Sequence, residues 1–186
     1  MSMGFFGFIP QQVVKPYRGP KDTLDKMVEH CLGNYGERSI IVRRFTETIV
    51  SQIQPKDYLS QILAIRNCTV QPSPTKSWMP MLVYTNDPRH VELVRTPERM
   101  VKEIMSQGYT VVDCDEYTEL VATMCLQIGR EVELVAVGFA PGNLSHVLAR
   151  VREPKTRQWI LMDGVAGPRE KEAAKSAKEI FIRSLD

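Results

Sequence analysis

The stretch Val111–Tyr117 constrains the fold most, because it joins a strand-like apolar run to a helix and places a cysteine at the junction. From Tyr117 onward, apolar residues recur every three or four positions, which is one face of an α-helix, and the pattern ends at Gly129. Cys114 is therefore expected at or just before a helix N-terminus. Unpaired backbone N–H groups there favour a thiolate, whereas the carboxylates on either side of the cysteine oppose it. A nearby base would have to tip this balance.

A candidate base lies downstream on a predicted β-hairpin. Residues 145–151 and 158–163 have the composition of strands, and a polar turn separates them. If Pro154 and Lys155 form the tip of this hairpin, His146 faces Asp163 directly, and opposite residues lie ~5 Å apart on one face of a sheet. A longer turn would shift this register.

Cysteine, histidine and aspartate in this order form the thiol version of a nucleophile, base and orienter. Segments 113–129, 132–137, 145–147 and 159–163 together resemble the transglutaminase-like superfamily, which shares the papain-like thiol fold. The chain is most similar to the small members encoded by bacteria and tailed phages, described as transglutaminase-like cysteine peptidases. The resemblance covers residues 58–166.

The resemblance implies a role for each residue of the triad. Cys114 would be the nucleophile, His146 the general base and Asp163 the orienter, with no metal or cofactor. Two neighbouring positions depart from the family pattern: Val112 stands where the family often has glycine, and Gly164 where it often has proline.

The predicted fold class is α+β, with a helical N-terminal half packed on a small antiparallel sheet from the C-terminal half. Helices are expected over 21–32, 38–53, from Pro55 onward and from Thr96 to Gly108, and strands over 79–84 and 132–137. We divide the chain into an N-terminal arm with the first helix (1–37), a transglutaminase-like core (38–166) and a C-terminal helix (167–186).

The composition argues against several classes of partner. The formal net charge is only +2, so the basic side chains of Arg38, Arg43 and Arg44 are interpreted as a solvated face and not as a nucleic-acid site. No apolar run approaches the ~18 residues needed to cross a membrane, and the N-terminus lacks the features of a signal peptide. The four cysteines lack metal-ligand spacing and are expected to be reduced thiols. The expected location is a virion or the cytoplasm of a host bacterium.

Two functions are consistent with these observations. The first is a thiol-dependent amide hydrolase or acyl transferase acting on a protein or peptide, carried on a phage particle or used in its assembly. The alternative is a catalytically silent virion structural protein of a tail, neck or baseplate. It would contact other virion proteins through the phenylalanine-rich arm and the C-terminal helix. For the enzyme, the Cys114 N–H is the first oxyanion donor, and the second is left open between Gln107 and Trp78.

Overall fold

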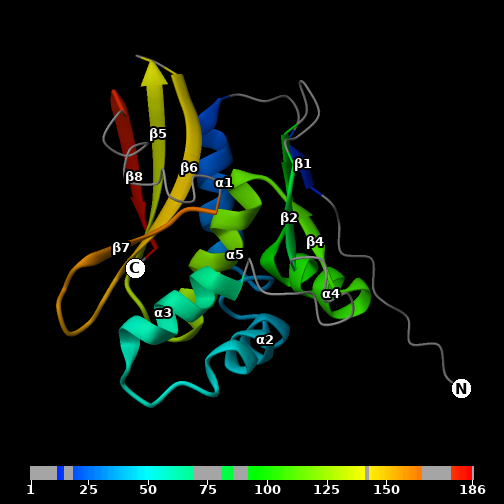
Figure 1. Cartoon of the computed structure of the whole chain (residues 1–186). Coiled ribbons are helices and arrows are strands. Elements are labelled where there is room, and N and C mark those ends of the chain that lie inside the picture. The colour runs from blue at the N-terminus through cyan, green and yellow to red at the C-terminus, as the bar shows by residue number, and fades with distance from the viewer. Residues whose placement is uncertain are drawn as a thin grey trace, which may run out of the picture.

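The computed structural model describes residues 12–14, 19–68, 81–85, 92–140, 143–164 and 177–185. It confirms the α+β class: five helices pack against a four-stranded antiparallel sheet, accompanied by a small parallel pair of strands (Figure 1). The helices are α1 (Pro20–Leu32), α2 (Ile40–Val50), α3 (Tyr58–Asn67), α4 (Pro97–Gln107) and α5 (Cys114–Gln127). The strands are β1 (Gln12–Val14), β2 (Leu82–Tyr84), β3 (Glu92–Val94), β4 (Thr110–Val112), β5 (Val132–Ala140), β6 (Asn143–Arg152), β7 (Trp159–Met162) and β8 (Glu179–Ser184).

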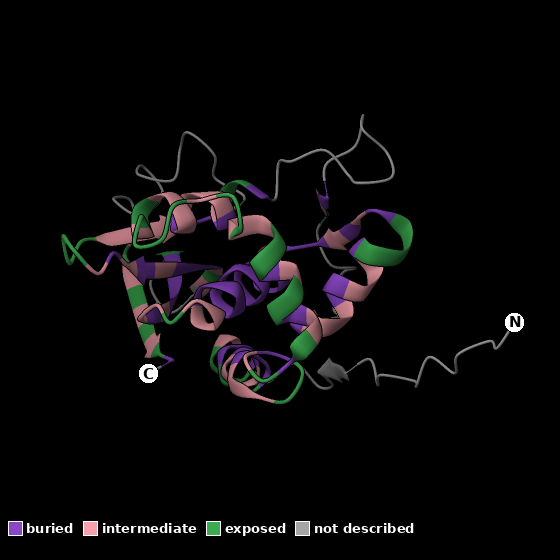
Figure 2. Cartoon of the chain, turned by 90° about the horizontal axis from the view of Figure 1, so that it is seen from below, coloured by how far each residue is buried: buried purple, intermediate pink, exposed green. Residues whose placement is uncertain are grey.

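Helix α5 is the centre of the hydrophobic core. It lies between the other helices and the main sheet, whose strand order is β7-β6-β5-β8. Eleven of its residues are buried, from Asp115 to Cys125, and the buried residues gather in the interior of the molecule (Figure 2). The Thr118 hydroxyl donates to the Val147 carbonyl oxygen over 3.2 Å, which fastens the first turns of α5 to β6. The residue that starts this helix is therefore held against the sheet.

The C-terminal helix predicted over residues 167–186 is wrong for its last part, which forms β8 and pairs with β5 as an edge strand. Residues 167–176 and 186 of that prediction lie outside the described residues, as do residues 1–11 and 15–18 of the N-terminal arm. The run Ile180–Phe181–Ile182 is typical of strands, and β5 offers it a free row of backbone groups. Pairing with β5 therefore outweighs the weak helical periodicity of the apolar residues in this segment.

The predicted hairpin exists, but its register is shifted by two residues. Val151 pairs with Ile160 and Ala149 with Met162, whereas a tip at Pro154–Lys155 would have paired Val151 with Gln158. The turn is longer because it closes around Glu153, whose backbone N–H donates to Gln158 and whose carbonyl accepts from Arg157. A shift of two leaves every side chain on its predicted face of the sheet.

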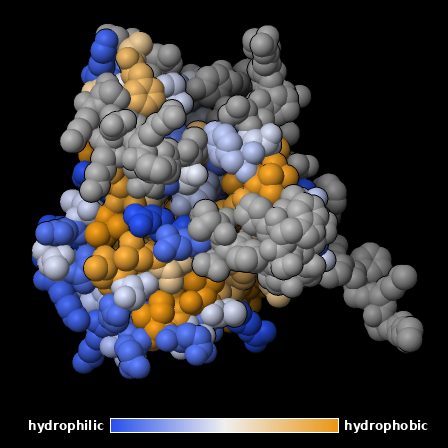
Figure 3. Space-filling view, viewed as in Figure 1, coloured by the Kyte–Doolittle hydropathy of each residue, from blue (hydrophilic) through white to orange (hydrophobic). Residues whose placement is uncertain are grey.

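Hydrophobic side chains reach the surface in patches between hydrophilic ones in the view that shows α2 and α3 (Figure 3). Ile40 at the start of α2 and Leu59 on α3 are among the exposed apolar residues. Within the described part of the chain, no helix has the length and apolar character needed to cross a membrane.

Candidate active site

The N-terminus of α5 is fixed by a capping box. An Asp113 side-chain oxygen accepts hydrogen bonds from the backbone N–H groups of Asp115 (2.9 Å) and Glu116 (3.3 Å). In return, the Glu116 carboxylate accepts from the Asp113 N–H over 3.2 Å. Cys114 is the first residue of the helix, which confirms its predicted place. The cap does not use the N–H of Cys114 itself.

Arg95 donates hydrogen bonds to the glutamate of this capping box. This residue was not singled out from the sequence. Its guanidinium donates to both Glu116 carboxylate oxygens, over 2.6 and 2.9 Å, and to the Val111 carbonyl oxygen. A bidentate pair of this kind fixes orientation as well as charge. Arg95 immediately precedes the Thr96–Pro97 helix start, so the segment that begins α4 also fixes the end of β4 and the start of α5.

His146 and Asp163 meet, as predicted. The His146 Nε2 lies 2.9 Å from the Asp163 Oδ2, and their side chains are 12% and 1% exposed. With the observed register, they are diagonal neighbours instead of direct partners, and diagonal neighbours remain within reach of long side chains. A carboxylate only accepts hydrogen bonds, so Nε2 carries the hydrogen and Nδ1 is the basic nitrogen.

The structure gives a steric reason for a glycine at position 164. A Cβ added at this position would lie 2.4 Å from the ring of Tyr117 on α5, a distance that side chains do not tolerate. The absence of a side chain lets the end of the hairpin lie flat on the first turn of α5. Gly164 therefore brings the adjacent Asp163 close to the N-terminus that carries Cys114.

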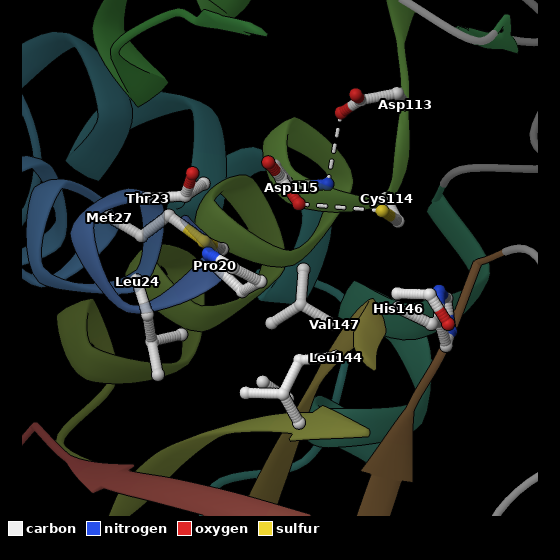
Figure 4. A pocket seen from close by; sticks show the side chains of 12 residues that line it. Pro20, Thr23, Leu24, Met27, Asp113, Cys114, Asp115, Leu144, His146 and Val147 are labelled. Carbon is white, nitrogen blue, oxygen red and sulfur yellow. Dashed lines mark hydrogen bonds between the residues drawn. The ribbon is translucent and has the colours of Figure 1, made fainter. Parts of the chain in front are cut away.

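Cys114 and His146 line the same pocket, which has a volume of about 180 Å³. Helix α1 forms one wall, and His146 lies on the opposite side with Val147 and Leu144 between them (Figure 4). Cys114 and Asp115 lie along the edge of the pocket at the start of α5. The lining residues are Pro20, Thr23, Leu24, Met27, Asp113, Cys114, Asp115, Ala136, Leu144, Ser145, His146 and Val147.

The surroundings of Cys114 keep its thiol protonated. Burial raises the thiol pKa most, followed by the negative charges of Asp115 and Asp113, while the Val147 backbone N–H acts in the opposite direction. The thiol contacts the Asp115 carboxylate at 3.4 Å, and among the described residues no hydrogen bond joins it to the His146 ring. The sequence set the helix N-terminus, which favours a thiolate, against the flanking carboxylates, which oppose it. In the structure burial adds to the effect of the carboxylates, and together they outweigh the helix N-terminus.

Of the two candidates for a second oxyanion donor, the structure describes only Gln107. The Gln107 side-chain amide donates to the Tyr109 carbonyl oxygen, and Trp78 lies outside the described residues. Donor atoms of Asp113, Cys114 and Asp115 lie within 4.8 Å of one another, a grouping with the composition of a metal site in the described part of the chain. One Asp113 oxygen in it already accepts two backbone N–H groups as a helix cap.

Comparison with known proteins adds no further constraint to this geometry: no family model, no curated protein and no solved structure matches the chain. The site is therefore defined by its own residues. It combines a thiol at a helix N-terminus, a histidine–aspartate pair and a pocket that the thiol and the histidine share.

Proposed function

We propose that the protein is a thiol-dependent acyl-transfer enzyme that cleaves or exchanges amide bonds of a protein or peptide. The observation that carries the proposal is the 2.9 Å contact between His146 and Asp163 beside a pocket that Cys114 also lines. The order of the three residues, with its resemblance to transglutaminase-like cysteine peptidases, supports the same reaction class. We assign Cys114 as nucleophile, His146 as general base and Asp163 as the residue that orients the imidazole.

Because the resting thiol is protonated, proton transfer accompanies the attack on the substrate. The Cys114 sulfur forms a bond to the carbonyl carbon, the carbonyl π electrons move onto the oxygen, and the thiol proton passes to the His146 Nδ1. The C–N bond then breaks, and His146 returns that proton to the departing amine. The product of this half-reaction is a thioester on Cys114.

The second half-reaction releases the acyl group. Water or an amine attacks the thioester carbonyl and gives a proton to His146, and the C–S bond breaks. Cys114 leaves as a thiolate and takes the proton back from His146, which restores the starting state. Attack by water makes the protein a hydrolase, and attack by an amine makes it a transferase.

Acylation by p-nitrophenyl acetate tests the proposal without knowledge of the natural substrate. We expect release of p-nitrophenolate together with an acetyl group on Cys114, located by peptide mass spectrometry. Cys114→Ala abolishes both signals, while Cys68→Ala, which removes a buried thiol outside the pocket, retains them. Adding a primary alkylamine separates transfer from hydrolysis. Wild-type protein that carries no acetyl group on Cys114 would contradict the proposal.

The second candidate, a catalytically silent structural protein of a virion, is favoured by a different observation. Strand β8 lies at an edge of the main sheet and carries apolar side chains that face solvent, Ile180 at 55% exposure and Ile182 at 40%. An exposed apolar edge strand is a surface on which other chains can pair. This candidate predicts the protein in purified particles at fixed stoichiometry. Its absence from particles would rule the candidate out.

A further inference from the structure

Strand β2 runs parallel to β4, the strand that leads into Cys114. Tyr84, the last residue of β2, has Val112 as its partner, and the next N–H, from Thr85, donates to the Val112 carbonyl oxygen over 2.9 Å. Parallel neighbours lie ~4.8 Å apart, so this pairing brings Tyr84 level with the end of β4, two residues before Cys114.

The pleat places the Tyr84 side chain on the side of the strands that faces the core. Leu82 and Val112 are both buried, and Tyr84 shares their face because alternate residues of a strand point the same way and paired residues share a face. At the end of the strand this face opens to solvent, and Tyr84 is 44% exposed. The side chain therefore borders the start of α5 while its ring remains accessible.

The charges around Tyr84 agree with this position. Partial burial contributes most to raising the pKa of the Tyr84 hydroxyl to about 12. Smaller contributions come from Cys114, when its thiol is ionised, and from the carboxylates of Asp113, Asp115 and Asp163. Cys114 and the proposed orienter, Asp163, are thus both within electrostatic range of the Tyr84 hydroxyl. Below that pH the phenol is neutral and can donate its hydrogen.

We propose that Tyr84 is a further catalytic residue of this site, which donates a hydrogen bond to the carbonyl oxygen of the group under attack. This inference rests on the proposed acyl-transfer function. As the C–S bond forms and the π electrons move onto the oxygen, the Tyr84 hydroxyl and the Cys114 backbone N–H together stabilise the negative charge. Tyr84 takes the place that the sequence left open between Gln107 and Trp78.

The test compares two reactions of Cys114 in wild type and Tyr84→Phe. Acylation by p-nitrophenyl acetate develops an oxyanion, whereas alkylation by iodoacetamide displaces iodide and develops none. We expect Tyr84→Phe to slow acylation by about 10²-fold, the size typical of one lost oxyanion donor, and to leave alkylation within about twofold. Tyr35→Phe is the matched control, since Tyr35 is equally exposed, at 45%, and lies between α1 and α2, away from β2 and β4.

Each outcome decides between distinct conclusions. Equal acylation of wild type and Tyr84→Phe would overturn the role of Tyr84 and leave the proposed function intact. A parallel loss of acylation and alkylation would also overturn it, because that result would mean that the hydroxyl only supports the structure around the thiol. If wild type is not acylated at Cys114, the proposed function fails and the inference fails with it.

Discussion

Among the described residues, two clusters bring together a cysteine, a histidine and an acid, and in one of them the cysteine and the histidine line a pocket. The first is Cys114 with His146 and Asp163. The second is buried between α1 and α5, where the His30 Nδ1 lies 3.3 Å from a Glu119 carboxylate oxygen and the Cys31 thiol contacts the Glu119 carbonyl oxygen. Residue types alone would not separate the two clusters.

Access to solvent distinguishes them. His146 lines a pocket, whereas the His30 and Glu119 side chains are 6% and 0% exposed. Burial lowers the pKa of His30 to about 4 and raises that of Glu119 well above its usual range, so burial favours the neutral form of both side chains. A buried neutral pair cannot exchange protons with a substrate. The comparison shows that a pocket, more than the set of side chains, identifies the reactive cluster.

The largest expected difference between the clusters is in thiol reactivity. In the native protein, iodoacetamide should label Cys114 about 10³-fold faster than Cys31, because a fully buried thiol reacts only when the structure opens. Peptide mass spectrometry after timed labelling gives both rates, and labelling in denaturant provides the control, since the difference should disappear there. Similar native rates at the two cysteines would contradict the distinction.

Removing each histidine should separate catalysis from stability. His146→Ala should lower the rate of Cys114 acylation by about 10²–10⁴-fold, as loss of a general base does. His30→Ala should leave that rate within about threefold and lower the free energy of unfolding by about 1–3 kcal/mol, because it removes a buried hydrogen-bonding partner of Glu119. Acylation kinetics of both variants measure the effect on catalysis, and urea unfolding of both measures the effect on stability. Slower acylation of Cys114 in His30→Ala than in His146→Ala would contradict the distinction between the two clusters.

The carboxylate nearest the thiol should restrain its reactivity. Asp115→Asn removes the negative charge that, after burial, raises the thiol pKa of Cys114 most. Alkylation of Cys114 at pH 7 should therefore become about tenfold faster, which corresponds to a decrease of about one pKa unit. Asp25→Asn is the matched control, since Asp25 is an exposed partner of Arg183. An unchanged or slower rate in Asp115→Asn would show that the charge does not govern the thiol.

The buried pair of His30 and Glu119 should make the free energy of unfolding depend on pH. Because the folded-state pKa of Glu119 is raised, its contribution to stability is complete below the unfolded value of ~4.5 and decreases as pH rises above it. His30 has the opposite sign: its lowered pKa means that stability is lost as pH falls from ~6.5 towards about 4.

Glu119→Gln isolates the first of these contributions, because the His30 contribution is common to both proteins. Relative to wild type, the variant should gain unfolding free energy steadily as the pH rises from 5 towards 8. Urea unfolding at several pH values measures this gain, with exposed Glu47→Gln as the control. A constant difference between Glu119→Gln and wild type would show that Glu119 is ionised in the folded protein.

Local patterns predicted most of what surrounds Cys114. The apolar face of α5 and its start at Cys114 follow from helical spacing. The meeting of His146 and Asp163 was predicted even though the hairpin register was wrong, because an error of two residues preserves the face of a strand.

Contacts between distant segments were not predicted. Arg95 reaches Glu116 because α4 packs against α5 and β4. Tyr84 pairs with Val112 because a parallel strand pairing brings residues 82–84 beside 110–112. A strand, a helix and a second strand in succession could have indicated that pairing. Strand β8 was missed because its partner, β5, lies far away in the sequence and its own pattern is weak. The strand propensity of a segment does not determine which sheet edge it will pair with.

The most direct test of the account is the pH dependence of Cys114 acylation by p-nitrophenyl acetate, compared between wild type and His146→Ala. A base that removes the thiol proton during attack should bring the wild-type rate to a plateau below pH ~8.5, where an ordinary thiol ionises. The His146→Ala rate should be lower and keep rising with thiol ionisation above that pH. Superimposable profiles for the two proteins would contradict the account, because Cys114 and His146 would then share a pocket without acting together.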